Sequence, residues 1–234
     1  MDELLSINSD SVGHFLRRWY GPALSVRDVH LDAPPYVPAE LTEWHTSAAL
    51  TSGPVTFQDR PTRPRDLAPD SHGMLEFWAE NQGSYFWSVN LADETLQVFS
   101  KESGGGEWTG TGEVLRDFLL HCTVREAVIG AASKFTIFVN AEEITKALER
   151  FEPLKFTALA SEEPQVKLWC SEDSLVRMAP PPTGYAGPRE QLWMLTFAAP
   201  SDSRIKRHAS RFGLETLAEV EPDRGELPYE PPPF

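Results

Sequence analysis

The stretch LEFWAENQGSYFWSVN, residues 75–90, consists of two aromatic-rich apolar runs on either side of a short polar turn. Apolar residues occupy every second position of both runs, namely Leu75, Phe77, Ala79, Tyr85, Trp87 and Val89. This alternation is typical of β-strands that bury one face. The turn Asn81-Gln82-Gly83 contains a glycine, which adopts positive φ without steric cost. The stretch therefore predicts an antiparallel β-hairpin.

The residues on either side of this hairpin predict helices and further strands. Helices are predicted at residues 9–20, 38–49, 113–131, 140–151 and 201–212, and strands at residues 96–100, 154–159, 166–170, 174–179 and 191–199. In the helix at 140–151, Asn140 can cap the N-terminus while Glu143 reaches back to its N–H. This order of elements predicts an α+β fold with a central antiparallel sheet flanked by helices.

The domain organisation follows from length and composition. A chain of 234 residues fits one large domain, since typical domains contain about 100–200 residues. No repeat or linker interrupts residues 9–220, which predicts a single domain. Residues 221–234 are acidic and rich in proline, and we expect this tail to be mobile.

The formal net charge of the chain is −14 at pH 7. An acidic surface repels phosphate, so nucleic acid is not an expected ligand. Opposite charge steers association, which favours a basic protein partner; the alternative is that the charge only maintains solubility. The basic segment Arg204–Arg211 either contacts an anionic surface or is a solvated helix face offset by nearby acids.

The cysteine content and the N-terminal residues bear on the cellular compartment. Cys122 and Cys170 are the two cysteines, and neither has a neighbour at zinc-binding or redox spacing. The first residues, MDELLSINSD, lack the basic and apolar regions of a secretory signal. No apolar run approaches the ~18 residues of a membrane span. The sequence therefore predicts a soluble cytoplasmic protein that does not enter a membrane.

Residue patterns for catalysis are weak. The six histidines show no metal-binding spacing: His14, His30, His45, His72, His121 and His208. Asp70, Ser71 and His72 are adjacent in one loop, but no G-x-S-x-G motif accompanies them. The run Gly104-Gly105-Gly106 lacks the lysine of a phosphate-binding loop. We expect no enzymatic activity, no cofactor and no metal ion.

The hairpin offers the best candidate contact residues for a partner. Trp78 lies on the face of the hairpin opposite the alternating apolar set. Either a helix covers that face and makes Trp78 core, or Trp78 belongs to an exposed aromatic patch, a type of surface enriched in interfaces. The candidate contacts are Glu76, Trp78, Glu80, Asn81, Gln82 and Tyr85. The alternative for Asn81-Gln82-Gly83 is ordinary turn chemistry.

Four segments of the chain resemble the SUKH superfamily, which includes a yeast cell-wall assembly regulator and many bacterial immunity proteins. They are HFLRRWYG at 14–21, PAELTEWHTSAA at 38–49, LEFWAENQGSYFWSVN at 75–90 and LRDFLLHCTVREAVIGA at 115–131, and together they cover about residues 12–131. The rest of the chain agrees with the family in outline only.

The resemblance implies a SUKH-like α+β domain with a central antiparallel sheet. It also implies a non-catalytic protein that binds another protein. In the immunity role, the partner is a secreted toxin, often a basic nuclease, and binding occludes it. In the alternative role, the protein is a cytoplasmic scaffold or regulator with an endogenous partner.

Overall fold

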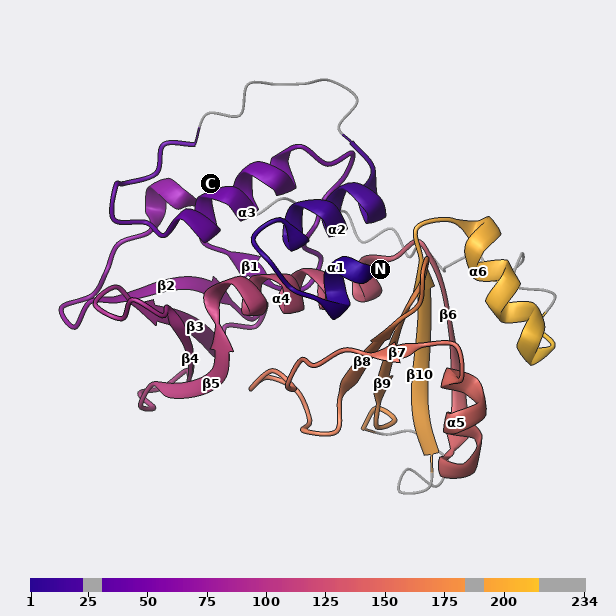
Figure 1. The fold of residues 1–234 in the computed structure, drawn as a ribbon. Coiled ribbons are helices and arrows are strands. Elements are labelled where there is room, and N and C mark those ends of the chain that lie inside the picture. The colour runs from indigo at the N-terminus through magenta and orange to yellow at the C-terminus, as the bar shows by residue number, and fades with distance from the viewer. Residues whose placement is uncertain (23–30, 184–191, 215–234) are drawn as a thin grey trace, which may run out of the picture.

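The computed structural model describes residues 1–22, 31–183 and 192–214. Its described residues form helices and two five-stranded antiparallel sheets, so the predicted α+β class is confirmed (Figure 1). The strands are divided between two sheets, whereas the sequence suggested one central sheet. The predicted tail at 221–234 lies outside the described residues.

The first half of the chain carries helices followed by the first sheet. Its elements are α1 (Asp2–Leu5), α2 (Ser11–Tyr20), α3 (Ala39–Ala49), β1 (Arg60–Pro61), η1 (Pro64–Asp66), β2 (Met74–Ala79), β3 (Tyr85–Asn90), β4 (Gln97–Glu102) and β5 (Thr109–Val114). The strands follow one another in the order β1-β2-β3-β4-β5, and β2 and β3 form the predicted hairpin. Helix α2 ends at Gly21, which has a φ of 73°.

The second half begins with the long helix and continues into the second sheet. Its elements are α4 (Leu115–Gly130), β6 (Ser133–Asn140), α5 (Ala141–Leu148), β7 (Glu152–Pro153), β8 (Lys167–Cys170), β9 (Leu175–Ala179), β10 (Leu192–Ala199), α6 (Asp202–Ala209) and η3 (Ser210–Phe212). The strand order is β6-β10-β9-β8-β7. The capping box of Asn140 and Glu143 is present at α5, as predicted.

Two segments differ from the sequence-based prediction. Residues 109–114 form β5 and pair with β4, although glycines at positions 110 and 112 weaken the strand signal. Residues 154–159 were predicted as a strand but belong to no helix or strand. Leu154 and Leu159, at the two ends of this segment, are instead buried in the core as the chain passes between the sheets.

Helix α4 packs against both sheets and against α2 and α3 (Figure 1). Phe118 of α4 lies 5.7 Å from Phe77 of the first sheet, measured between ring centroids. Leu175 of the second sheet belongs to the same buried apolar cluster as Phe118. On the helical side, Trp44 Nε1 donates a hydrogen bond of 2.8 Å to Thr123 Oγ1. Residues around the whole circumference of α4 are therefore buried.

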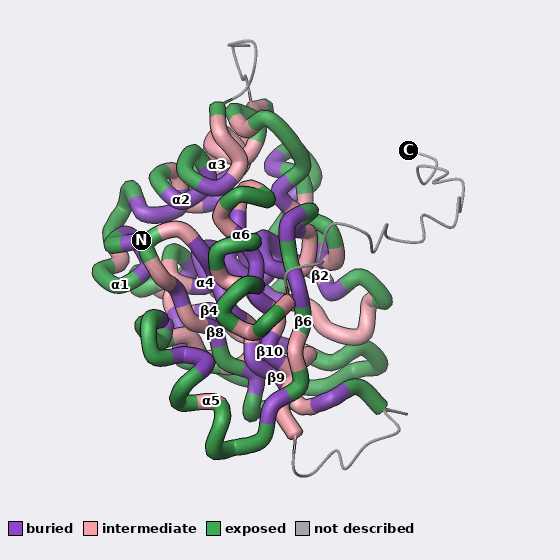
Figure 2. The backbone as a smooth tube through the Cα atoms, turned by 90° about the vertical axis from the view of Figure 1, so that its right-hand side faces the viewer, coloured by how far each residue is buried: buried purple, intermediate pink, exposed green. Residues whose placement is uncertain are grey.

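A second apolar cluster lies between the second sheet and the helices α5 and α6. Phe135 and Phe197 stack there with ring centroids 4.9 Å apart. Figure 2 shows α5 and α6 as largely exposed helices lying over strands that are buried in part. Each sheet thus has its own apolar packing, and α4 joins the two.

A buried ionic cluster around Arg125 reinforces this junction. The guanidinium of Arg125, a residue only 4% exposed, lies 3.0 Å from a carboxylate oxygen of Asp59 and 3.1 Å from one of Glu126. It also lies 3.0 Å from Glu162, whose same oxygen accepts a bond of 2.9 Å from Arg177. The cluster links α4, the segment before β1, the loop before β8 and strand β9.

The carboxylates of the cluster respond differently to burial. Burial raises the pKa of Asp59 and that of Glu126, and the neighbouring Arg125 only partly opposes it. Burial also acts to raise the pKa of Glu162, but Arg125 and Arg177 outweigh it and hold that pKa below its usual range. Glu162 is therefore the carboxylate most firmly held in its charged form.

Replacing Arg125 with methionine removes the charge and keeps a similar apolar length. We expect Arg125→Met to lower the free energy of unfolding by about 3–5 kcal/mol at neutral pH, because Asp59 and Glu126 lose their cation and Glu162 keeps only Arg177. The loss should shrink as the pH falls toward 5, because Asp59 and Glu126, whose pKa values burial raises, take up protons. Urea denaturation at several pH values measures it. Arg150→Met is the control, because Arg150 is 70% exposed, and an equal loss in both variants would contradict the prediction.

The segment before β1 is fastened to α4 at a second place. The Glu126 carboxylate accepts hydrogen bonds from the backbone N–H groups of Phe57, Gln58 and Asp59. The ring of Phe57 then lies directly over the last residue of α4, Gly130. A Cβ atom at Gly130 would come within 2.0 Å of that ring.

Gly130→Ala should therefore destabilise the protein by about 1–3 kcal/mol, the usual effect of overpacking. In a Phe57→Ala background the same change should be neutral or stabilising, because alanine favours a helix more than glycine does. Urea denaturation of the four proteins of this cycle measures the coupling. If the effects of the two substitutions on stability are additive, the Phe57 ring is not the reason for a glycine at position 130.

Candidate functional site

Two neighbouring turns form one end of the first sheet, and we call residues 80–85 and 102–107 the hairpin tip. The carboxylate of Glu80 closes the first turn, since it accepts bonds of 2.9 Å from Gln82 N and 3.2 Å from Ser84 N. Gly83 has a φ of 70°, and its N–H donates to the Glu80 carbonyl. The backbone of this turn is thus held by Glu80 and, from strand β1, by Arg60, whose guanidinium donates to the Asn81 carbonyl.

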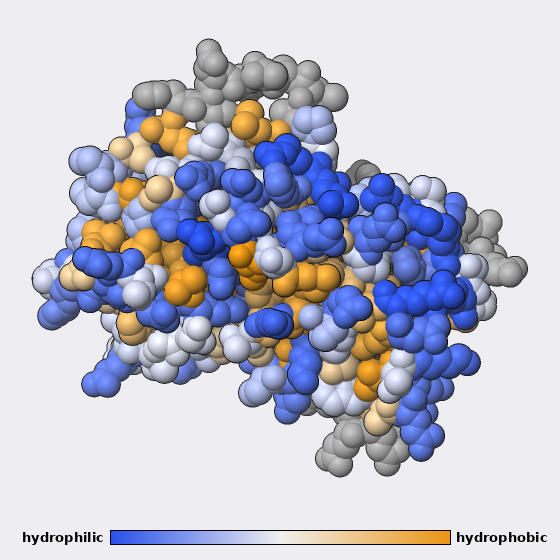
Figure 3. All heavy atoms as spheres, viewed as in Figure 1, coloured by the Kyte–Doolittle hydropathy of each residue, from blue (hydrophilic) through white to orange (hydrophobic). Residues whose placement is uncertain are grey.

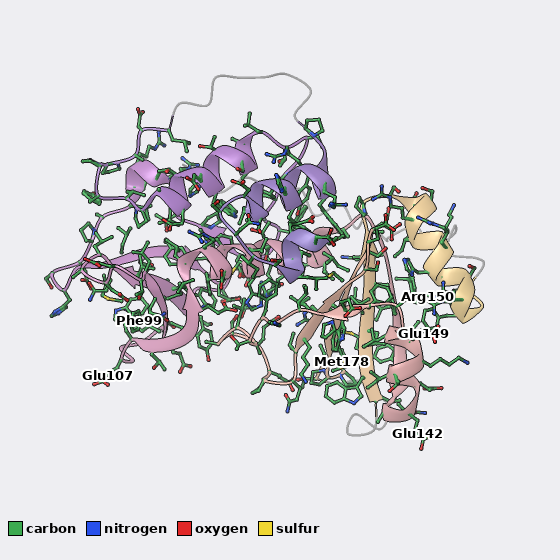
Figure 4. All side chains as sticks on the ribbon, viewed as in Figure 1. Phe99, Glu107, Glu142, Glu149, Arg150 and Met178 are labelled. Atoms are coloured by element: carbon green, nitrogen blue, oxygen red, sulfur yellow. The ribbon has the colours of Figure 1, made fainter. Side chains whose placement is uncertain are left out.

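The second turn is tied to the first. Ser103 N donates a hydrogen bond of 2.8 Å to Ser84 O, and Tyr85 pairs with Glu102 across the strands. Glu107 lies at the outer end of the connection between β4 and β5 (Figure 4). Glu102 and Glu107 are both exposed. The tip therefore presents exposed acidic side chains on two turns whose backbones are hydrogen-bonded to each other.

The structure corrects the placement of two candidate contacts. Trp78 is fully buried: its Nε1 donates to Asp59 at 3.2 Å and its ring meets that of Trp44 edge-on at 5.3 Å. A register shift between Glu76 and Trp78 turns Trp78 inward beside Phe77. Trp78 is thus a core residue beneath α3 and is not available to a partner. Glu80 is only 8% exposed and serves its own turn.

The other four candidates do not form one group. Asn81 and Gln82 are exposed at the tip, and Tyr85 is half-buried there, with its ring 6.5 Å from that of Trp87. Glu76 is exposed farther along β2, where it pairs with the buried Ser88 of β3. Sequence reasoning missed Glu102 and Glu107, although the register of a three-stranded meander would have placed their turn beside residues 81–84.

The loop at residues 70–72 is a turn rather than a catalytic triad. Asp70 Oδ1 accepts hydrogen bonds of 2.8 Å from His72 N and 3.0 Å from Met74 N. These bonds, led by the one from Met74, hold the pKa of Asp70 below its usual value. The carboxylate therefore stabilises the start of β2.

A serine and a histidine meet elsewhere. Ser174 Oγ lies 3.0 Å from Nε2 of His208, and Asp173 Oδ1 lies 3.7 Å from the same nitrogen. A catalytic triad needs the carboxylate at Nδ1, so that the other nitrogen can take the serine proton. Burial lowers the pKa of His208 more than Asp173 raises it. This contact fastens the turn between β8 and β9 to α6.

Two basic residues of the segment Arg204–Arg211, one in α6 and one in η3, pair with acids, as one of the two interpretations of this segment expected. Arg207 lies 2.6 Å from Asp173, and Arg211 lies 2.8 Å from Glu149. Hydrophilic atoms dominate the surface over α6 in Figure 3.

Among the described residues, no group of three or more His, Cys, Asp or Glu side chains is arranged to hold a metal ion. No helix of that part of the chain is both long enough and apolar enough to cross a membrane. His121 is buried, with Nδ1 3.2 Å from Glu113 and its ring stacked on Phe156 at 4.7 Å. Both contacts hold His121 within the core.

Both cysteines are free and buried. Burial raises the pKa of Cys170 to about 11 and that of Cys122 well above its usual value. Thiolate is the reactive form, so neither thiol should react with DTNB in the native protein at pH 8. Both should react within minutes in 8 M urea or guanidinium. Rapid labelling of the native protein would contradict the described burial.

Comparison of the chain with protein-family models, curated proteins and solved structures finds no match.

Proposed function

We propose that this protein is a non-catalytic binding module of the immunity type, which occludes a basic protein partner, a toxin, with its hairpin tip. The observation that carries the proposal is the pair of joined turns. The Glu80 carboxylate and the bond between Ser103 and Ser84 hold the backbone. The exposed side chains of Asn81, Gln82, Glu102 and Glu107 are left to face a partner.

Charge supports a basic partner. A net charge of −14 creates an attractive field for a cationic protein, and such fields raise association rates by about 10–10³-fold. Tyr85 supplies an aromatic ring at the base of the tip, and tyrosine is enriched among residues that dominate binding energy. The field would guide the partner, and the tip would make the contact.

The SUKH resemblance of residues 12–131 points to the same role. The polar clusters described above hold turns and elements together. Their roles are structural, which favours a binding function over catalysis. The ionic cluster of Arg125 is buried, and the contact of Ser174 with His208 lacks triad geometry. A scaffold protein with an endogenous partner is the second candidate, which the same resemblance favours.

In the first step of the test, the tagged protein captures its partner from a lysate of its source cells at low and at high salt. In the second step, the association rate of the captured partner is measured. The double variant Glu102→Lys/Glu107→Lys should reduce the association rate by at least about 10-fold at low salt, and much less at high salt. The matched control is Glu142→Lys/Glu172→Lys, which makes the same change of charge at exposed sites outside the tip. Equal effects of the two variants would contradict the role of the tip.

The partner's identity then separates the two candidate functions. A basic protein that is toxic on expression, and harmless on coexpression with this chain, would support the immunity role. An endogenous non-toxic partner would replace it with the scaffold role. Failure to retain any partner at either salt concentration would overturn the proposal.

A further inference from the structure

Helix α2 contains a glycine, Gly13, in its first turn. Glycine weakens a helix relative to alanine, so its position calls for a local reason. A Cβ atom at Gly13 would lie 3.4 Å from Arg17 Nη1 and 3.5 Å from Ser47 Oγ. The guanidinium of Arg17 therefore folds back over the bare backbone of its own helix, toward α3.

Gly13 and Arg17 line a pocket of about 190 Å³ where α2, α3 and α4 meet. Its apolar lining comes from Val12, Trp44 and Leu119. Trp44 and Leu119 are almost fully buried, and the Nε1 of Trp44 is already bonded to Thr123. The pocket is smaller than the about 300–1,000 Å³ typical of drug-sized ligands, which limits it to a ligand of amino-acid size.

Charges of both signs surround this apolar lining. Arg17 approaches from α2 and Arg116 from α4. The carboxylates are Glu40 and Glu43 of α3 and Asp10, the N-cap residue of α2. Glu40, Trp44 and Ser47 are spaced at i, i+4 and i+7 and so share one face of α3. Two of the three carboxylates thus come from α3, which carries neither arginine of the pocket.

The cations of the pocket are poorly neutralised. Arg17 makes no salt bridge within the described residues, and Arg116 approaches Glu40 only at 3.9 Å. A guanidinium prefers a carboxylate that it can contact with two N–H groups. The pocket therefore holds an arginine that lacks its preferred anion, beside carboxylates that can accept from an ammonium group.

We propose that this pocket binds a small zwitterion, an α-amino acid with an apolar side chain. Its carboxylate contacts Arg17, its ammonium group contacts the carboxylates of α3, and its side chain lies against Trp44 and Leu119. A monocarboxylate lacks the group that Glu40 and Glu43 bind, and a simple amine faces Arg17 without a counter-charge. This site is separate from the hairpin tip and does not depend on the proposed partner.

Calorimetry and thermal melting of the full chain test the proposal with L-alanine, L-valine and L-leucine as probes. At least one should bind and raise the melting temperature. The analogues of leucine that lack one charged group, 4-methylpentanoate and 3-methylbutylamine, should bind at least about 10-fold more weakly. No binding by any of the three amino acids at 10 mM, or equal binding by leucine and both analogues, would overturn the proposal.

Two variants locate the site. Arg17→Gln should weaken amino-acid binding at least about 10-fold and leave the melting temperature of the free protein unchanged, because Arg17 is exposed and without a salt bridge. Gly13→Ala should raise the melting temperature of the free protein but weaken binding, since the added Cβ enters the pocket. Arg150→Gln, the same change of charge on an exposed arginine outside the pocket, should leave binding intact. Equal affinities of Arg17→Gln and Arg150→Gln would rule out this pocket.

Discussion

The buried guanidinium of Arg125 is the interaction on which the rest of the structure depends. It lies on α4, within 3.1 Å of carboxylates from three separate places in the chain. A buried charge is tolerated only when its partners are correctly placed. The segment before β1 and the loop before β8 must therefore both reach α4 before the cluster is complete. This requirement couples the two sheets, although each has apolar packing of its own.

Much of the fold can be predicted from local signals. The hairpin at 75–90, the capping box at Asn140 and the end of α2 at Gly21 each depend on a few neighbouring residues. The division of strands between two sheets could not be predicted, because it depends on pairings between distant residues. The register shift beside Trp78 also breaks the alternation of faces, and period-two reasoning cannot detect an inserted residue.

The candidate sites likewise depend partly on neighbouring residues, which the sequence reveals, and partly on contacts between distant residues, which it does not. Asn81 and Gln82 are recognisable as turn residues from the sequence. The presence of Glu102 and Glu107 beside them follows only from the register of β3 with β4. For the pocket at α2 the sequence offered one signal, a glycine inside a helical stretch. The structural reason for that glycine is the close approach of a second helix, α3. The buried environment of Trp78 likewise depends on the position of α3.

In the first turn of the hairpin tip, the side chains that fix the backbone differ from those that are exposed. Glu80 and Gly83 determine the path of the backbone, whereas the side chains of Asn81 and Gln82 make no hydrogen bond within the described residues. Substitutions at those two positions can thus alter the chemistry of the surface without disturbing the strands beneath. Such a surface can diversify quickly under selection for a changing partner, while the sheet and its central helix stay the same.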